Sequence, residues 1–148
     1  MRTGNRFRQA GTELVEFAIT ALLLFMLLFG IIEFSIVFFD KATITNASRE
    51  GARTGILFRQ DPRDLGAENA AIEAAVRDYA EAYLISLGGP ASLSVQIQRT
   101  DLDGDGTYNA GDELSVTVDY PYDFLILPQF ASSVTDMTLS ATAAMRAE

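Results

Sequence analysis

Six oxygen-bearing residues in the C-terminal half are spaced as ligands of a metal ion. Counted from Asp101, positions 1, 3, 5, 7, 9 and 12 are Asp101, Asp103, Asp105, Thr107, Asn109 and Asp112. A glycine, Gly106, stands at position 6. A twelve-residue Ca²⁺ loop uses oxygen ligands at these positions, with a backbone carbonyl at position 7 and a glycine at the sharp turn. The spacing therefore predicts a structural Ca²⁺ site that includes the Thr107 carbonyl.

The last position of this segment leaves an alternative open. EF-hand loops carry a bidentate Glu there, whereas this chain has Asp112, and Glu113 lies one place too late to replace it. In this respect the segment resembles dockerin-type loops, which favour Asn at position 9 and Asp at position 12. The alternative is an acidic hairpin turn, because Asp-Gly is a common turn signal. Four aspartates without a cation would, however, repel one another.

A second reactive group, Glu16, lies inside an apolar run that extends from Leu14 to Phe39. About 20 apolar residues at a rise of about 1.5 Å cross the hydrocarbon core of a bilayer, so the run predicts a membrane-spanning helix at about residues 14–39. A carboxylate near the end of such a helix costs free energy and usually has a partner or a function. The simpler alternative is that Glu16 snorkels to the lipid headgroups. A cleavable secretory signal is not predicted, because its apolar core would be shorter.

The charges on either side of this run predict the orientation of the chain. Arg2, Arg6 and Arg8 precede it, and the first 11 residues contain no acidic side chain. The positive-inside rule then makes residues 1–11 a cytoplasmic basic leader and exports the part beyond the membrane. The whole chain carries −9, of which the three arginines contribute +3, so residues 12–148 carry −12.

This composition argues against several classes of function. An acidic exported domain is a poor partner for nucleic acid. The chain has neither Cys nor His, which removes the commonest nucleophile–base pairs and the usual zinc ligands. We therefore predict neither an enzyme nor a small-molecule substrate.

Two helices are predicted to position these groups. No proline or turn cluster occurs between Phe39 and Phe58, so the N-terminal helix is expected to cover residues 12–58. On this helix the small residues Ala47, Gly51 and Gly55 recur every fourth position, so another backbone could approach closely. We favour packing against the chain's own sheet over contact with another subunit. Asp61 is predicted to cap a second helix that begins at Pro62. Its apolar stripe comprises Leu65, Ile72, Val76, Tyr79, Tyr83 and Leu87, and the helix is expected to end at Gly88-Gly89-Pro90.

Three later runs have a period of two and predict strands. Apolar residues alternate with polar ones from Leu93 to Ile97, from Leu114 to Val118 and from Met137 to Ala143. Packed on the helices, they form an antiparallel sheet of about three strands. The expected fold is α+β, with a transmembrane helix that continues into a small exported domain at residues 59–148.

The N-terminal segment resembles that of type IV-like prepilins. It contains Gly11, then four residues, then Glu16-Phe17. Further along, Gly30-Ile31-Ile32-Glu33-Phe34 and Asn46-Ala47-Ser48-Arg49-Glu50-Gly51-Ala52-Arg53 resemble the TadE-like family of the tight-adherence (Flp) pilus, as does the closing Met145-Arg146-Ala147-Glu148. The resemblance implies a pilin-like domain and leaves roughly residues 58–135 without a matching motif.

The resemblance also implies roles for individual residues. A prepilin peptidase would cut between Gly11 and Thr12, and the new ammonium of Thr12 would lie one helical turn from Glu16. Such a pair attracts far more strongly at low dielectric than in water, on one chain or between neighbours during assembly. Glu16 and Phe17 are then assembly residues, whereas Glu13 and Glu33 have no assigned role.

Two functions from different classes follow. The first is a minor pseudopilin of the inner membrane, either within the pilus fibre or assisting its assembly. Its partners are the prepilin peptidase, other pilus subunits and the assembly platform. The second is a calcium-dependent adhesin or sensor domain held by an uncleaved anchor. Processing at Gly11 distinguishes them.

Overall fold

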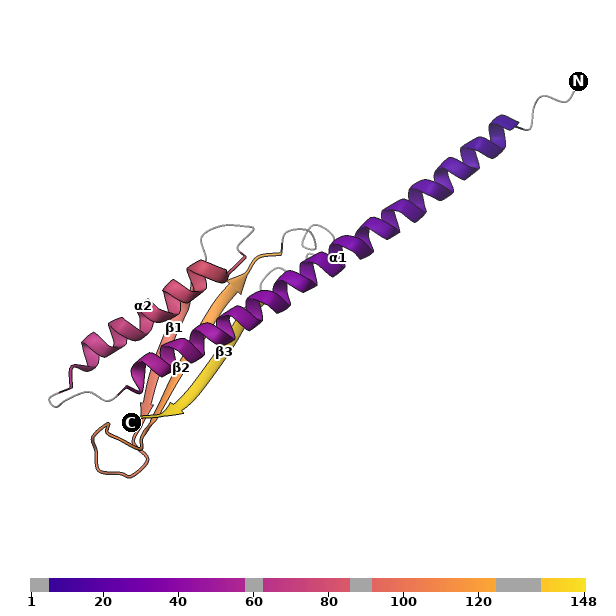
Figure 1. Ribbon diagram of the computed structural model, residues 1–148. Helices are drawn as coiled ribbons and strands as arrows, with labels where there is room; N and C mark the ends of the chain where they lie inside the picture. Colours follow the sequence, from indigo (N-terminus) through magenta and orange to yellow (C-terminus); the bar gives the residue numbers. More distant parts are fainter. Residues whose placement is uncertain (1–5, 58–62, 86–91, 125–136) are drawn as a thin grey trace, which may run out of the picture.

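The computed structural model describes residues 6–57, 63–85, 92–124 and 137–148, and the side chains from Gly11 onward. It confirms the α+β fold, with a long apolar N-terminal helix, a second helix and a three-stranded antiparallel sheet (Figure 1). In chain order the elements are α1 Arg6–Gly55, α2 Leu65–Tyr83, β1 Ser94–Thr100, β2 Glu113–Tyr122 and β3 Met137–Arg146.

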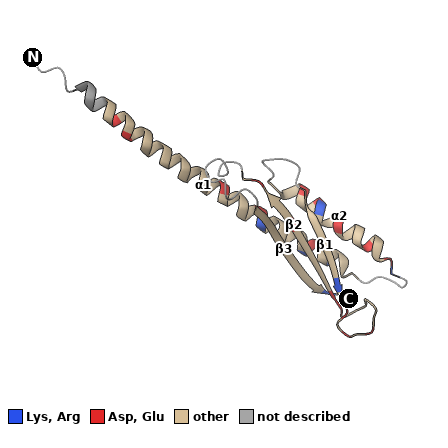
Figure 2. Cartoon of the chain, turned by 180° about the vertical axis from the view of Figure 1, so that it is seen from behind, with Lys and Arg blue, Asp and Glu red and all other residues tan. Residues whose placement is uncertain are grey.

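The N-terminal half of α1 projects away from the rest of the molecule (Figure 1). Every large apolar side chain from Leu14 to Phe29 is exposed. Within the residues described, α1 is the one helix long and apolar enough to cross a membrane, judged by length and composition. Figure 2 shows acidic side chains near the start of this half, and residues 17–32 contain no charged side chain. A soluble protein would bury such a surface, so the helix fits a single-pass membrane protein.

The C-terminal half of α1 packs against both α2 and the sheet. A Cβ at Gly51 would lie 2.5 Å from Val76 Cγ2, and one at Gly55 would clash with the side chains of Leu114 and Ile72. Real side chains do not approach so closely, so both glycines are required by packing. The predicted small-residue face is therefore confirmed as a packing stripe within the chain.

The second helix begins later than the sequence predicted. Its N-cap is Asp64, whose carboxylate accepts hydrogen bonds from the N–H groups of Gly66 and Ala67, both at 3.0 Å. The prediction of Asp61 as N-cap and Pro62 as first helical residue is therefore wrong for α2, and both residues lie outside the described part. A side-chain oxygen directly before Leu65 satisfies the free N–H groups of the first turn, which fixes the start.

Only the middle of the predicted apolar stripe on α2 is buried. Ile72 and Val76 are inaccessible and Tyr79 is half-buried, whereas Leu65 and Tyr83, the first and last residues of the helix, are exposed. Ala80 is buried in addition. The helix ends at Tyr83 with Leu84 as C-cap, before the predicted end, and Leu87 to Pro90 lie outside the described residues.

The strands follow the order β1-β2-β3, and both pairings are antiparallel. All three period-two runs are confirmed as strands. Their apolar positions form one face, on which Val116 pairs with Ile97 and with Ala143, and the helices cover that face (Figure 1). The opposite face is polar; there, Thr117 and Thr142 share a hydrogen bond of 2.8 Å. The result is a two-layer domain whose membrane-side end meets the middle of α1.

Candidate functional site

The predicted processing and assembly residues lie together at the start of the exposed half of α1. Gly11, Thr12, Glu16 and Phe17 are all exposed, and Glu16 follows Thr12 by four positions, which places both on one face of the helix. A Cβ at Gly11 would meet nothing within 4 Å. Packing within the described chain therefore does not require glycine there, in contrast to Gly51 and Gly55. Because glycine in a helix costs about 1 kcal/mol relative to alanine, its presence at position 11 calls for another reason.

Glu33, which the sequence left without a role, is buried where α1 meets the domain. It is 1% exposed, and its Oε1 accepts a hydrogen bond of 3.0 Å from the phenol of Tyr122 at the end of β2. Desolvation, followed by the hydrogen bond to Glu33, raises the pKa of Tyr122, so the phenol stays protonated and donates. The domain therefore shields an acid that the sequence places within the predicted span.

A second carboxylate, Asp40, is buried two turns further along the same face of α1. Its Oδ1 accepts a hydrogen bond of 3.0 Å from the N–H of Ile85, just after α2, whereas its Oδ2 is buried with no hydrogen-bond partner among the residues that the structure describes. Desolvation raises the pKa of Asp40, and the Ile85 N–H opposes this effect. Two buried carboxylates of α1 thus bond to the domain, Glu33 to the end of β2 and Asp40 to the residue that follows the C-cap of α2.

The predicted calcium loop connects β1 to β2 and brings together three of its aspartates. Ligand atoms of Asp101, Asp103 and Asp105 lie within 4.8 Å of one another, and all three side chains are exposed. Gly104 and Gly106 adopt φ values of 79° and 83°, which glycine accepts without strain. These turns fold the loop so that the three carboxylates converge on one point.

Hydrogen bonds within the loop set the charge state of this group. The N–H groups of Gly106 and Gly104 donate to Asp101 and lower its pKa. The pKa of Asp103 is raised: the N–H of Asp105 lowers it, but desolvation, the hydrogen bond with Asp101 and the charges of Asp105 and Asp112 outweigh that effect. The charges of Asp105 and Asp112, which contribute to the raised pKa of Asp103, are a repulsion that a cation would relieve.

The structure does not bring Asp112 into this group. Asp112 is 1% exposed, and its two carboxylate oxygens accept from the N–H groups of Leu102, at 2.9 Å, and Asn109, at 2.8 Å. The Asp112 carboxylate therefore holds the two ends of the loop together by accepting from backbone N–H groups. Asn109 donates its amide to Asp105 at 2.6 Å, and the hydroxyl of Thr107 donates to the same residue at 2.7 Å. The ligand set at positions 7, 9 and 12 stays a prediction.

A cluster that the sequence analysis missed anchors the loop to the rest of the domain. The guanidinium groups of Arg63 and Arg99 lie 4.8 Å and 5.2 Å from the ring centre of Tyr108, a loop residue. Arg63 also donates two hydrogen bonds of 3.0 Å to Glu68, which is buried in α2. This cluster joins the loop to β1, to α2 and to the residue before the N-cap of α2, and no local pattern in the sequence could have indicated it.

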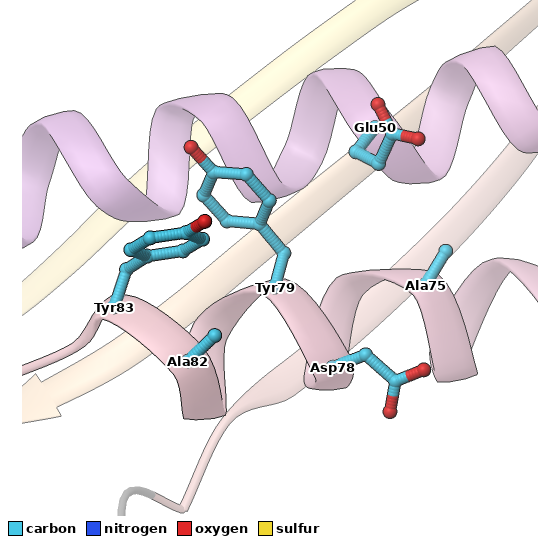
Figure 3. A pocket seen from close by; sticks show the side chains of 6 residues that line it. All are labelled: Glu50, Ala75, Asp78, Tyr79, Ala82 and Tyr83. Carbon is cyan, nitrogen blue, oxygen red and sulfur yellow. The ribbon is translucent and has the colours of Figure 1, made fainter.

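The outer side of the helical layer carries a shallow, open groove of about 510 Å³. The rings of Tyr79 and Tyr83 lie 4.8 Å apart between α2 and α1, Glu50 faces them from α1, and Asp78 points away from them (Figure 3). Ala75 and Ala82 complete the lining. The described lining of the groove thus combines two aromatic rings with two carboxylates.

Within the described residues, these features define an α+β protein with one candidate membrane helix. Residues 11–53 match the family model of TadE-like proteins, which confirms the resemblance seen in the sequence and identifies this segment as TadE-like. The match begins at Gly11 and covers almost all of α1 from there. No curated protein and no solved structure matches the chain. The family match indicates a protein related to the tight-adherence pilus, with a structural role.

Proposed function

We propose that the chain is a minor pseudopilin, a structural or assembly subunit of a bacterial tight-adherence (Flp-type) pilus. The observation that carries the proposal is that the family match begins at Gly11, directly before the exposed apolar run that starts at Leu14. Its partners are then the inner membrane, a prepilin peptidase, other pilus subunits and the assembly platform. The N-terminus lies in the cytoplasm and the domain on the opposite side, in keeping with the three leader arginines.

Cleavage after Gly11 is part of this proposal. The structure supports it because Gly11 is exposed and has no packing role in the described residues. Removal of the leader leaves an ammonium on Thr12, one turn from the carboxylate of Glu16. In the low-dielectric bilayer an unpaired charge is costly, so each group stabilises the other, on one chain or across two during assembly.

The membrane-spanning part of α1 is proposed to be shorter at its C-terminal end than the predicted residues 14–39. Glu33, Val37 and Asp40 are buried against the domain, which the lipid does not enter. The stretch from Thr12 to Ile32 has 21 residues. At a rise of about 1.5 Å it measures about 31 Å, which matches a hydrocarbon core of about 30 Å.

The second candidate, a calcium-binding adhesin or sensor on an uncleaved anchor, is supported by the convergence of Asp101, Asp103 and Asp105. Ca²⁺ there would neutralise the three carboxylates and fix the connection between β1 and β2. A structural Ca²⁺ ion is equally compatible with a pseudopilin. Calcium binding alone therefore does not favour the second candidate, whereas a chain that keeps its leader would.

The proposed function is tested in the native bacterium by comparing Glu16→Gln with the matched control Glu13→Gln. Both residues are exposed acids at the start of α1, but Glu13 lies outside the prepilin pattern. We expect Glu16→Gln to abolish or strongly reduce fibres recovered by shearing while the chain stays in the membrane, and Glu13→Gln to leave them at wild-type yield. Normal fibre yield in Glu16→Gln would contradict the assembly role, and normal yield after deletion of the chain would contradict the proposed function.

A further inference from the structure

The helix α1 has two different faces where it meets the domain. One face, with Glu33, Val37 and Asp40, is buried. On the other side of the same turns, Phe34, Phe38 and Phe39 are exposed, and Phe38 has 71% of its surface accessible. Three phenylalanines beside a folded domain form an apolar surface that is continuous with the exposed apolar half of the helix.

The height of these rings follows from the helix geometry. If Thr12 to Ile32 cross the hydrocarbon core, the turns from Glu33 to Asp40 cover about the next 10 Å. The headgroup layer on one side of a bilayer is about 5–8 Å thick, from the difference between total and hydrocarbon thickness. The Cα of Phe34 then lies about 3 Å past Ile32, inside the headgroup layer, and those of Phe38 and Phe39 lie about 9–10 Å past it, just outside. Because helical side chains tilt toward the N-terminus, the rings of Phe38 and Phe39 reach back to the outer edge of that layer, in which the domain also begins.

A second element contributes apolar side chains at the same height. The hydrogen bond from the Ile85 N–H to Asp40 Oδ1, at 3.0 Å, fixes the end of α2 beside Asp40. Ile85 and Tyr83 are both exposed, Tyr83 to 55%. Figure 1 shows that this end of α2 faces the projecting half of α1. Tyrosine suits the boundary between lipid and water, since its ring is apolar and its hydroxyl is polar.

We infer that this end of the domain lies directly on the bilayer surface, with Phe34, Phe38, Phe39, Tyr83 and Ile85 forming a lipid-contact collar. The inference rests on the membrane anchoring in the proposed function. The occupant is the lipid because the collar continues the surface of the spanning segment without a break. Since residues 12–148 carry −12, the contact depends on apolar area and not on attraction to anionic headgroups. We therefore expect the collar to orient the domain against zwitterionic lipid as well, and its contact with the bilayer to be unaffected by salt.

Single tryptophans in the full chain test this inference, because the native sequence has none. Phe38→Trp and Tyr83→Trp report on the collar, Phe25→Trp on the middle of the span, and Leu102→Trp on the exposed loop at the opposite end of the domain. Each variant is placed in phosphatidylcholine nanodiscs with or without bromine on the acyl chains, and emission is compared at low and high salt. We expect strong quenching at position 25, intermediate quenching at 38 and 83 in both salts, and none at 102.

The outcomes separate the inference from the proposed function. An unquenched tryptophan at position 25 would contradict the membrane span itself, and with it the proposed function. Quenching at 25 without quenching at 38 and 83 would overturn the collar alone. Blue-shifted but unquenched emission at 38 and 83 would also overturn it, because those residues would then be covered by another protein surface, such as a second copy.

Discussion

The hydrogen bond between Tyr122 and Glu33 predicts a large effect for the removal of a single oxygen. Tyr122→Phe leaves the ring in place but deprives a buried carboxylate of a donor at 3.0 Å. A hydrogen bond to a carboxylate contributes about 1.5–3 kcal/mol. The expected loss of about 2 kcal/mol is a substantial part of a typical domain stability of 5–15 kcal/mol.

Urea unfolding of the full chain in detergent micelles, followed by the far-ultraviolet circular dichroism of the domain, measures this loss. With an m value of about 2 kcal/mol/M, the midpoint falls by about 1 M. Tyr120→Phe is the matched control, because Tyr120 is buried on the same strand and its hydroxyl makes no hydrogen bond to the described residues. It is expected to change the midpoint far less.

A double-mutant cycle separates the hydrogen bond from general packing. Glu33→Met removes the charge at similar volume, and the combined Glu33→Met, Tyr122→Phe variant leaves an apolar contact with no buried acceptor. Replacing both partners by apolar groups of similar shape is often nearly neutral, so the two substitutions should couple by about 1.5 kcal/mol or more. Strictly additive effects, or a Tyr122→Phe midpoint equal to that of the wild type, would refute the reasoning.

Three further predictions follow from the same structure. Desolvation raises the pKa of Asp40, so its contribution to stability is fully present below the unfolded value near 3.8 and is lost as pH rises through the folded value. When urea unfolding is repeated from about pH 7 down to about pH 4, the wild type should therefore gain stability relative to Asp40→Asn. A difference between the two that does not change with pH would contradict this. Gly55→Ala should cost about 1–3 kcal/mol by overpacking while Gly30→Ala, where a Cβ meets nothing, leaves the unfolding midpoint of the domain unchanged; equal effects would remove the packing argument. Ca²⁺ at about 100 times its Kd should stabilise the domain by about 2.7 kcal/mol in thermal unfolding, and Asp103→Asn but not Glu113→Gln should abolish the gain; no response of the wild type would refute the calcium site.

Much of the fold could be predicted because its signals are local. Alternation of period two located three strands, and the spacing of Gly51 and Gly55 indicated a closely packed face, against which the structure places side chains of α2 and β2. The start of α2 was misplaced because Asp61-Pro62 and Asp64 both offer a capping oxygen within a few residues. Local chemistry alone does not decide between two such starts.

The functional groups were harder to predict because several depend on distant partners. The sequence singled out the three converging aspartates, but it gave no sign that Asp112 would bond to the loop backbone. Glu33 meets Tyr122 across 89 positions of sequence, so its burial depends on how the sheet packs on α1. The cluster around Tyr108 likewise needs two arginines that lie far apart in the sequence, Arg63 and Arg99. Cleavage after Gly11 and pairing with Glu16 remain predictions from the family resemblance.

The measurement that tests the central claim most directly is the intact mass of the protein purified from its native membrane. We predict a mass that begins at Thr12 in the wild type, and a full-length mass when the prepilin peptidase is deleted or Gly11 is replaced by alanine. The Gly11→Ala result is specific, because a Cβ at that position meets nothing within 4 Å and should not disturb the fold. A full-length mass both with and without the peptidase would contradict processing and favour a calcium-binding domain on an uncleaved anchor.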